Sequence, residues 1–371
     1  MFCKESMVTM QAMLLAGEAS GDILGSDILV QANKQFPKVR WVGTGGRHCR
    51  DAGLDIIYDI TDLSVMGFAI LGHLTRLWGI YNHLKRVIRT QRPQVLITVD
   101  YPGLNLRLSR YAKSLGIKTI HVVSPQFWAW RPKRLYQMPH LTDKMAVLWP
   151  FEVPYYQSIG MPVVCIGHRA AQLKTLSPPA NPKPVIGLLP GSRPQEIERH
   201  FSLMVEAAQQ LGQRYVGCRF VLLTPQHLVD HPCYQGWPKH LSLTTQHQIS
   251  PALAQVDVAL VCSGTATFEV AMLGVPMVII YRTKAWSYWL AKQLVQLKQI
   301  GLPNILHTQA NVPELIQSQA NPKAIAQALE QLLNDQARQA KMRQVFKEIK
   351  QATQPKRPHP ILDWLTACLK S

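Results

Sequence analysis

Short apolar runs alternate with stretches of helical periodicity along most of this chain. Strands that are buried on both faces of a parallel sheet give continuous apolar runs, whereas helices repeat their apolar residues every three or four positions. The pattern therefore predicts an α/β fold in which parallel sheets are covered by helices on both faces. The predicted strands are Ala12–Ala16, Val39–Val42, Val95–Val99, Thr119–Val123, Met145–Leu148, Val163–Ile166, Val185–Leu189, Arg219–Leu223, Val256–Cys262 and Met277–Tyr281.

The segments between these runs have helical periodicity, and lysine-rich helical material closes the chain. The predicted helices are Asp22–Gln35, Leu71–Arg89, Leu106–Leu115, Pro132–Met138, Pro154–Ile159, Gln195–Leu211, Ala266–Leu273, Trp286–Leu297 and Pro322–Leu333.

A proline-rich connector, Ser177–Pro184, interrupts the pattern, which then starts again. The chain has 371 residues, which suits two domains of about 150–200 residues each. We predict two doubly wound, Rossmann-like domains, residues 1–176 and 177–354, that face a cleft. Ligands of such domains bind at the carboxyl ends of the strands.

The most informative of these strand ends is Ser263–Glu269, which follows the strand Val256–Cys262. A strand that breaks at Ser263-Gly264 and continues as a helix directs backbone N–H groups and the positive end of the helix dipole at one point, where a phosphate can bind. Glu269 falls about one turn into that helix, where a carboxylate can accept the two hydroxyls of a ribose. The alternative is a packed turn without a ligand.

Two acidic residues follow strands in the first half. Asp100 comes directly after Val95–Val99, at the place where a general base is expected, although an Asp there can also cap the next helix. Glu18 lies in the loop Gly17–Asp22, where two glycines allow a tight turn and Ser20 or Asp22 can cap the helix. That arrangement leaves Glu18 facing the crevice.

Other strand-end loops carry cations and aromatic residues. Leu189–Arg193 places an arginine fork where a diphosphate would need it. Ser124–Arg131 holds two tryptophans beside cations, which suits a sugar face, a phosphate or a wedge between domains. Tyr281-Arg282 and Leu302–Asn304 lie at later turns of the second domain.

The charge balance favours anionic partners. With 40 Lys+Arg against 22 Asp+Glu, the formal net charge is +18. No basic run or nucleic-acid-binding motif accompanies that charge, so we rank phosphate ligands and a membrane surface above DNA or RNA. The seven scattered cysteines are typical of reduced thiols in a cytosolic protein. No Asp-x-Asp pair is present to hold a metal ion on a diphosphate, and we expect no bound metal ion.

One apolar segment, from Val65 to Tyr81, has two open interpretations. A helix that is apolar all round is normally buried. Because Arg76, Lys85, Arg86 and Arg89 accompany it, the segment can equally be an interfacial helix that dips into an anionic membrane. The candidate membrane or acceptor residues are Val65, Met66, Phe68, Ile70, Leu71, Leu74, Leu77 and Trp78. We find no window of about 18 apolar residues that would span a bilayer.

Taken together, these loops resemble those of lipid-A-disaccharide synthases, in the family's order and over most of the chain. The resemblance implies an inverting glycosyltransferase of the GT-B type that uses no metal ion and no cofactor. The segments that carry it are Gly17–Asp22, Ser64–Gly67, Asp100–Asn105, Ser124–Arg131, Ile166–His168, Leu189–Arg193, Ser263–Glu269, Tyr281-Arg282 and Leu302–Asn304.

The same resemblance implies the substrates. The donor is UDP-2,3-diacylglucosamine, the acceptor is 2,3-diacylglucosamine 1-phosphate (lipid X), and the products are a β-1,6-linked disaccharide 1-phosphate and UDP. The enzyme is expected to lie on the inner face of the cytoplasmic membrane as a peripheral protein. Its final helix, about residues 355–371, is expected to return to the first domain, and some members of the family form homodimers through that region.

Individual positions carry over as follows. Asp100 corresponds to the base that takes the proton from the acceptor 6-hydroxyl, and Glu18 is the second candidate catalytic residue. Glu18 and Asn304 match other positions of the cleft. The positions expected to hold the UDP-sugar are Arg193, Ser263, Gly264, Thr265, Glu269 and Asn304.

The chain departs from the family pattern in two places. Gly103 stands where a second acid is common, and Arg169–Gln172 stands where an acid usually follows the Gly-His pair, so the sequence leaves the positioning of the acceptor open.

Two other functions remain as alternatives. Another GT-B enzyme of UDP-sugars, such as a UDP-N-acetylglucosamine 2-epimerase, would need no exposed apolar helix. A non-catalytic, basic membrane-surface protein would be indifferent to Asp100→Asn.

Overall fold

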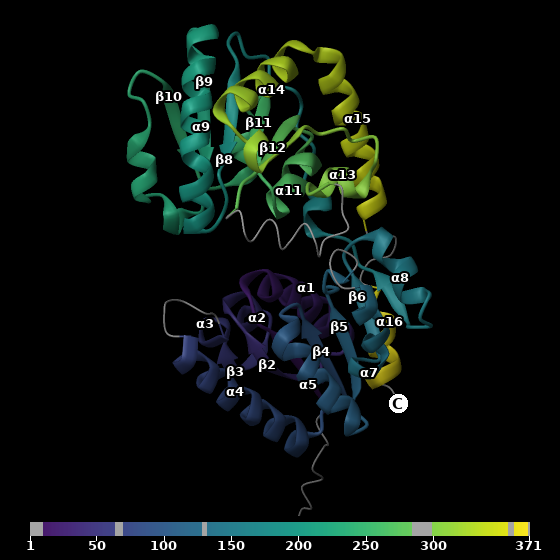
Figure 1. Ribbon diagram of the computed structural model, residues 1–371. Helices are drawn as coiled ribbons and strands as arrows, with labels where there is room; N and C mark the ends of the chain where they lie inside the picture. The colour runs from purple at the N-terminus through teal and green to yellow at the C-terminus, as the bar shows by residue number, and fades with distance from the viewer. Residues whose placement is uncertain (1–9, 64–69, 128–131, 284–298, 355–359, 370–371) are drawn as a thin grey trace, which may run out of the picture. The chain divides into compact units, whose positions relative to one another are not determined.

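The computed structural model describes residues 10–63, 70–127, 132–283, 299–354 and 360–369 (Figure 1). Its contacts divide the chain into two compact units. Unit 1 contains Met1–Gly167 together with Pro355–Ser371, and unit 2 contains His168–Gln354. Unit 2 therefore begins before the proline-rich connector, at His168, and not at residue 177.

Unit 1 is built on a seven-stranded sheet in the order β3-β2-β1-β4-β5-β6-β7, and its neighbouring strands run parallel. Crossovers between parallel strands need helices, which explains the alternation in the sequence. The strands are β1 (Gln11–Ala16), β2 (Arg40–Gly45), β3 (Leu54–Asp59), β4 (Val95–Val99), β5 (Lys118–Val122), β6 (Lys144–Val147) and β7 (Val163–Cys165).

Helices cover both faces of this sheet. The α-helices are α1 (Ala19–Gln35), α2 (Arg47–Asp51), α3 (Ile60–Leu63), α4 (Ile70–Gln91), α5 (Pro102–Ser114), α7 (Met138–Leu141), α8 (Val153–Gln157) and α16 (Ile361–Leu369). Residues of α1 and α16 form one apolar cluster with the sheet, and residues of α4 and α5 form a second cluster. Short 3-10 helices are η1 (Pro132–Gln137) and η2 (Pro150–Glu152).

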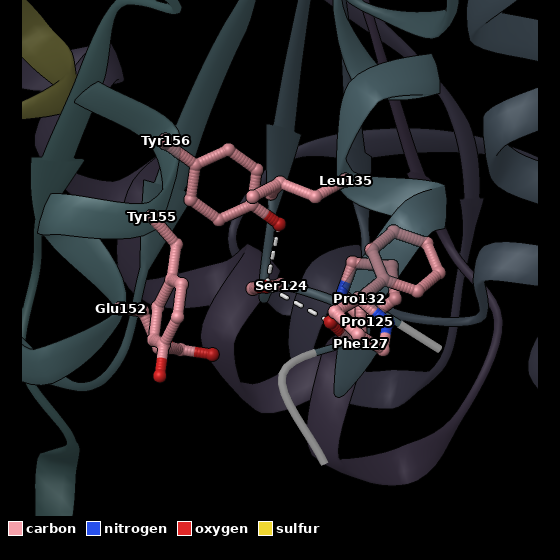
Figure 2. Close-up of a pocket in the computed structure, with 8 residues that line it drawn as sticks. All are labelled: Ser124, Pro125, Phe127, Pro132, Leu135, Glu152, Tyr155 and Tyr156. Atoms are coloured by element: carbon pink, nitrogen blue, oxygen red, sulfur yellow. Dashed lines mark hydrogen bonds between the residues drawn. The ribbon is translucent and has the colours of Figure 1, made fainter. Parts of the chain in front are cut away.

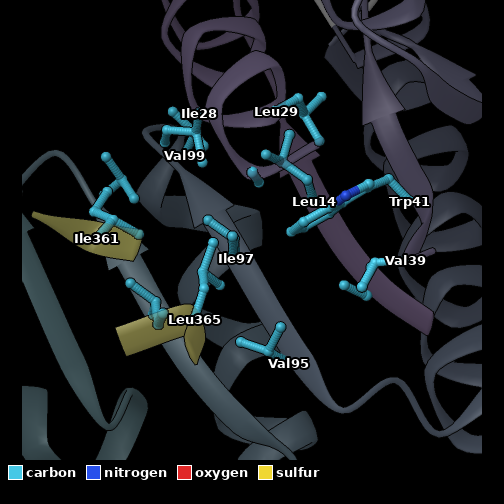
Figure 3. Close-up of a cluster of buried hydrophobic side chains, with 14 of the residues drawn as sticks. Leu14, Ile28, Leu29, Val39, Trp41, Val95, Ile97, Val99, Ile361 and Leu365 are labelled. Carbon is cyan, nitrogen blue, oxygen red and sulfur yellow. The ribbon is translucent and has the colours of Figure 1, made fainter. Parts of the chain in front are cut away.

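The last helix, α16, is part of the core of unit 1. Ile361 and Leu365 lie among Ile97, Val99 and other residues of the first apolar cluster (Figure 3), and Leu365 is fully buried. Burying one such leucine contributes about 1.5–3 kcal/mol. The amide of Gln35 in α1 also donates a hydrogen bond to the hydroxyl of Thr366, at 3.0 Å. The end of the chain thus stabilises the sheet that carries its beginning.

Unit 2 repeats the plan with a six-stranded parallel sheet in the order β10-β9-β8-β11-β12-β13. Its strands are β8 (Val185–Leu189), β9 (Arg219–Leu223), β10 (Ser242–Gln246), β11 (Val258–Cys262), β12 (Met277–Tyr281) and β13 (Glu314–Ile316). Its helices are η3 (Arg169–Gln172), α9 (Pro194–Arg214), η4 (Gln226–Leu228), η5 (Pro232–Gly236), α10 (Ile249–Leu253), α11 (Thr265–Leu273), α13 (Leu302–Leu306), η6 (Gln317–Gln319), α14 (Pro322–Asn334) and α15 (Gln336–Thr353).

The predicted strands are all present, and the prediction of a parallel α/β fold is confirmed. The strands that were not predicted, β3, β10 and β13, lie at edges of the two sheets. An edge strand is only partly buried, so its sequence lacks a continuous apolar run. Pro132–Met138 begins as a 3-10 helix and not as the expected α-helix. The helix predicted over Trp286–Leu297 lies outside the described residues.

The structure describes only part of the apolar segment from Val65 to Tyr81. Val65, Met66 and Phe68 lie outside the described residues, as do the side chains of Ile70, Leu71 and Leu74. Further along α4, one face enters the core through the buried residues Ile80, Leu84 and Ile88, and Leu77 packs against them. Trp78, in contrast, is 61% exposed. In the part of the chain that the structure describes, no helix is both long and apolar enough to cross a bilayer.

Candidate functional site

The first group of candidate residues lies where the strand order of unit 1 reverses. The central strands β1 and β4 pair there, with Ala16 opposite Val99. Ligands of doubly wound sheets bind outside the carboxyl ends of the strands at such a switch point. Glu18 follows β1 and Asp100 follows β4, so the two acidic residues predicted from the sequence leave the sheet from neighbouring strands.

The backbone at Asp100 is unusual. Asp100 and Tyr101 have φ angles of 51° and 49°, which is the left-handed region that non-glycine residues rarely adopt. The N–H of Asp100 donates to the carbonyl of Val122 at 2.8 Å. The amide of Asn105 donates to the carbonyls of Asp100, Val99 and Leu15, at 2.8, 3.1 and 3.2 Å. These bonds hold the strained turn in place.

Asp100 does not cap the next helix, because the N-cap of α5 is Tyr101. The carboxylate of Asp100 accepts the backbone N–H of Tyr101 at 2.8 Å. Partial burial raises the pKa of Asp100 above its ordinary value of 3.8, and the bond from Tyr101 opposes that effect. A carboxylate with a raised pKa binds a proton more readily, which is the property that a general base requires.

Tyr101 connects the loops after β1 and β4. A Cβ atom at Gly17 would lie 2.6 Å from the ring of Tyr101, so only glycine allows this close approach. The Tyr101 hydroxyl donates to the carbonyl of Leu63 at 3.1 Å. Burial and the nearby charge of Glu18 raise the pKa of Tyr101. Glu18 itself is the N-cap residue of α1.

Ser20 or Asp22 was expected to cap the helix that follows Gly17, but both lie inside α1, and Asp22 is buried. Its carboxylate accepts the N–H groups of Gly46, His48 and Cys49 at 2.6, 3.0 and 3.0 Å. Asp22 thus caps α2 and not α1. Although burial opposes it, these hydrogen bonds lower the pKa of Asp22. Asp22 therefore stabilises the fold near the switch point.

The loop after β5 forms a small pocket (Figure 2). The Ser124 hydroxyl contacts that of Tyr156 at 2.6 Å, and Phe127, Leu135 and Tyr155 contribute to the walls. The two tryptophans of the predicted sugar or phosphate loop, Trp128 and Trp130, lie outside the described residues.

The second group of candidate residues lies at the switch point of unit 2. There β8 pairs with β11, with Leu189 opposite Val261. Arg193 follows β8 as the N-cap of α9, and its side chain is 78% exposed. Its guanidinium contacts the Glu196 carboxylate at 3.2 Å, and that carboxylate also accepts the N–H of Ser192 at 3.0 Å. Glu196 therefore orients the loop that presents Arg193.

After β11, the chain opens into α11 at Gly264. A Cβ atom added to Gly264 would meet no atom of the described residues within 4 Å, so none of these residues fills the space at this point. The Thr267 hydroxyl donates to the carbonyl of Gly264 at 2.8 Å, and the Ser263 hydroxyl donates to that of Ile300 at 3.2 Å. Thr265 is exposed in the first turn. The first N–H groups of a helix have no acceptor within the helix and suit an anion.

Glu269 is half-buried one turn into α11. Burial raises the pKa of Glu269, and the charge of Arg169 opposes that effect. Arg169 directly follows His168, at the start of η3, and places a cation near Glu269. Beside it, burial and Arg169 lower the pKa of His168 to about 4, which keeps His168 neutral. The His168 ring contacts Phe268 edge-on, with ring centroids 5.1 Å apart.

Asn304 has an internal role that the sequence did not indicate. It is 2% exposed, and its amide donates to the Val312 carbonyl at 2.9 Å and to the Glu314 carboxylate at 2.6 Å. Both of its N–H bonds are thus used within unit 2. Glu314 also accepts the N–H groups of Ile300 and Gly301, each at 2.9 Å. Asn304 and Glu314 therefore hold the turn that Ser263 contacts, which argues against a direct contact between Asn304 and the donor.

Comparison with known proteins identifies the family. A family model described as lipid-A-disaccharide synthetase matches residues 12–360. The lipid-A-disaccharide synthase of Geobacter metallireducens is 36% identical over 349 residues, which cover 90% of each chain. That of Trichlorobacter lovleyi is 37% identical over 339 residues, which cover 88% of each chain.

Solved structures are similar in fold. The glycotransferase of kitacinnamycin has a TM-score of 0.65 at 15% identity, covering 97% of this chain and 98% of that one. A UDP-N-acetylglucosamine 2-epimerase from Neisseria meningitidis, bound to UDP-GlcNAc, has a TM-score of 0.61 at 12% identity, covering 96% and 100%. At these identities the likeness shows the fold alone. The sequence relatives favour the synthase over the epimerase.

The raised pKa of Asp100 predicts a stability change. The charged carboxylate destabilises the folded state above its folded pKa, and this effect disappears below the unfolded value of 3.8, where both states are protonated. Asp100→Asn removes the charge and tolerates the left-handed backbone. We expect its melting temperature to rise by roughly 2–4 °C at pH 7, equivalent to about 1 kcal/mol. The gain should begin to shrink as the pH falls through the folded pKa and approach zero near the unfolded value of 3.8.

Asp143→Asn is the matched control, for which we expect the opposite change in melting temperature. Although burial opposes it, hydrogen bonds from Lys113 and Thr119 lower the pKa of Asp143. This substitution should lower the melting temperature at pH 7. Thermal unfolding followed by circular dichroism from pH 4 to pH 8 measures both changes, and a loss of stability in Asp100→Asn at pH 7 would contradict the strained, desolvated carboxylate.

Proposed function

The chain belongs to the lipid-A-disaccharide synthase family, and from this premise we propose which substrate each switch point binds. It is a glycosyltransferase of the GT-B fold that forms the disaccharide of lipid A biosynthesis. The observation that carries the proposal is the position of Asp100, a partly desolvated carboxylate directly after a central strand of unit 1.

The donor is UDP-2,3-diacylglucosamine, bound at the switch point of unit 2. Arg193 is exposed at the end of β8 and supplies a planar cation for the diphosphate. The N-terminus of α11 begins at Gly264 and Thr265, and it adds N–H donors and the positive end of its dipole. Ser263 contributes a hydroxyl oxygen, and Glu269 accepts the ribose hydroxyls. These groups neutralise the charge that develops on UDP as it leaves.

The acceptor is 2,3-diacylglucosamine 1-phosphate, bound at the switch point of unit 1. Its 6-hydroxyl oxygen forms the new bond to C1 of the donor sugar while the bond from C1 to the UDP oxygen breaks. The hydroxyl proton passes to the Asp100 carboxylate. An inverting transfer needs one base in this way, whereas a glycosidase needs two carboxyl groups. Glu18, on the neighbouring loop, faces the same switch point.

The acylated substrates belong to a membrane, and α4 has a surface that suits one. Trp78, Arg86 and Arg89 are exposed, and their spacing places them on one side of the helix, away from the buried face. An amphipathic aromatic residue with basic neighbours binds the headgroup region of anionic lipids. We assign this side of α4 to the inner surface of the cytoplasmic membrane.

The activity is tested by mass spectrometry after incubation with UDP-2,3-diacylglucosamine and lipid X. The wild-type protein should yield the tetra-acyl disaccharide phosphate. We expect Asp100→Asn to lower the yield by at least about 10²-fold, a loss typical of removing a general base. Its affinity for UDP, measured by calorimetry, should stay within a few-fold of wild type.

Arg193→Ala is the complementary variant. Because it removes the diphosphate contact and leaves Asp100 in place, it should weaken UDP binding itself by roughly tenfold, or about 1.4 kcal/mol. A folded wild-type protein that binds UDP but forms no disaccharide would overturn the activity. Unchanged UDP binding in Arg193→Ala would overturn the donor site.

Vesicle sedimentation tests the membrane surface. We expect Trp78→Glu to bind phosphatidylglycerol vesicles about threefold to tenfold more weakly, because it replaces an interfacial aromatic residue by an anion. Tyr136→Glu is a suitable control, since Tyr136 is also exposed in unit 1 but lies in η1 and not on α4. Equal binding by the Trp78 and Tyr136 variants would contradict the assignment to α4.

A further inference from the structure

His200 is a buried histidine of α9 that the proposed reaction does not use. It is 1% exposed and makes two short polar contacts through its ring. Its Nδ1 lies 2.8 Å from the carbonyl oxygen of Glu196, and its Nε2 lies 3.0 Å from the backbone nitrogen of Arg282. The Cys262 sulfur lies 3.4 Å from Nδ1.

These partners determine the protonation of the ring. The Glu196 carbonyl only accepts a hydrogen bond, so Nδ1 must carry the proton. The Arg282 N–H only donates, so Nε2 must be bare. Burial lowers the pKa of His200, which keeps the ring in this neutral form at neutral pH. His200 therefore links an acceptor on α9 to a donor that follows β12.

The linked segments lie at the carboxyl ends of the strands of unit 2, where we place the donor. Glu196 lies in the first turn of α9 and orients Arg193. Cys262 ends β11, directly before Ser263 and Gly264. Arg282 follows the last residue of β12, Tyr281, whose ring lies 6.1 Å from that of His200. One imidazole thus contacts the chain segments at the carboxyl ends of three of the six strands, β8, β11 and β12.

The sheet does not fix these segments by itself. The pairing of β11 with β12 ends at Cys262 and Ile280, and that of β12 with β13 ends at Tyr281 and Ile316. Arg282 lies beyond both, and the Gln317 side chain hydrogen-bonds to the next residue, Thr283. The hydrogen bonds between strands include no residue of α9, which is held to the sheet by side-chain packing. His200 supplies a directional contact between the helix and the strand exit where the ladder supplies none.

We propose that His200 is a positioning residue of the donor site, holding the first turn of α9 and the exit of β12 at fixed places beside the end of β11. This inference rests on the proposed donor site. It goes beyond that site by assigning a role in UDP binding to a side chain that does not touch UDP. Its effect passes through Arg193 and through the backbone at Arg282.

A pair of amide variants separates this role from simple packing. In His200→Gln, the side-chain oxygen reaches the position of Nε2 and can accept the Arg282 N–H. In His200→Asn, the shorter amide reaches the position of Nδ1 and can donate only to Glu196. Both variants are polar and neutral, so they differ chiefly in the contact with Arg282.

The control is Gln339→Ala, in α15 of the same unit. Gln339 is buried, and its amide donates to the Leu332 carbonyl at 2.9 Å. Its removal should lower the melting temperature without changing the affinity for UDP. The UDP affinity of this variant shows how far a loss of stability alone changes UDP binding.

The measurement is the dissociation constant for UDP by calorimetry, with steady-state kinetics on the same proteins. We expect His200→Gln to stay within about threefold of wild type and His200→Asn to bind UDP at least about tenfold more weakly. The KM for the donor should rise in the Asn variant, while the KM for lipid X stays unchanged. Equal UDP affinities in the two variants, both folded, would overturn the role of His200. Failure of wild type to bind UDP would instead overturn the donor site itself.

Discussion

The constraint on which the rest depends is the parallel direction of the strands in each unit. Because the strands run the same way, the turns that lead from strand to helix all leave from one edge of the sheet. Where the strand order reverses, the chain leaves two neighbouring strands in opposite directions and opens a crevice between them. The reversal lies between β1 and β4 in unit 1 and between β8 and β11 in unit 2. The acidic and basic candidates follow these four strands.

The two switch points differ in their electrostatics. In unit 1, desolvation makes a carboxylate more basic, and a strained turn held by Asn105 and Tyr101 keeps it in place. In unit 2, an exposed arginine and a helix N-terminus provide positive charge and N–H donors. A base suits the hydroxyl of an acceptor, and a positive edge suits a leaving diphosphate. The carboxylate of unit 1 and the positive groups of unit 2 are therefore the two kinds of group that a glycosyl transfer requires.

Much of this fold was predictable because central strands are buried on both faces. Val95–Val99, Val185–Leu189 and Met277–Tyr281 are continuous apolar runs, and the structure gives these strands the same bounds. The edge strand Ser242–Gln246 has only one apolar residue, Leu243, so periodicity could not reveal it. The position of Asp100 after a strand was readable, but its positive φ and the bonds of Asn105 were not, because they depend on contacts between β1, β4 and α5.

In unit 2, too, contacts between separate segments could not be predicted from the sequence. Asn304 matched a family position, yet its partners Val312 and Glu314 come from a later segment. The contact of His200 with Arg282 spans 82 positions of the sequence. A directional contact of that range leaves no local signal, since the residues involved are neither periodic nor adjacent. Sequence patterns thus located the strand ends, and the structure was needed to show which of their side chains hold the loops.

The pH dependence of kcat/KM for the acceptor tests the central claim most directly, with folding monitored at each pH. A single base with a raised pKa predicts that kcat/KM is constant near neutrality and falls about tenfold per pH unit below one ionisation, which lies above the ordinary aspartate value of 3.8. A rate that stays constant down to pH 4 in the folded enzyme would contradict the assignment of Asp100 as the base.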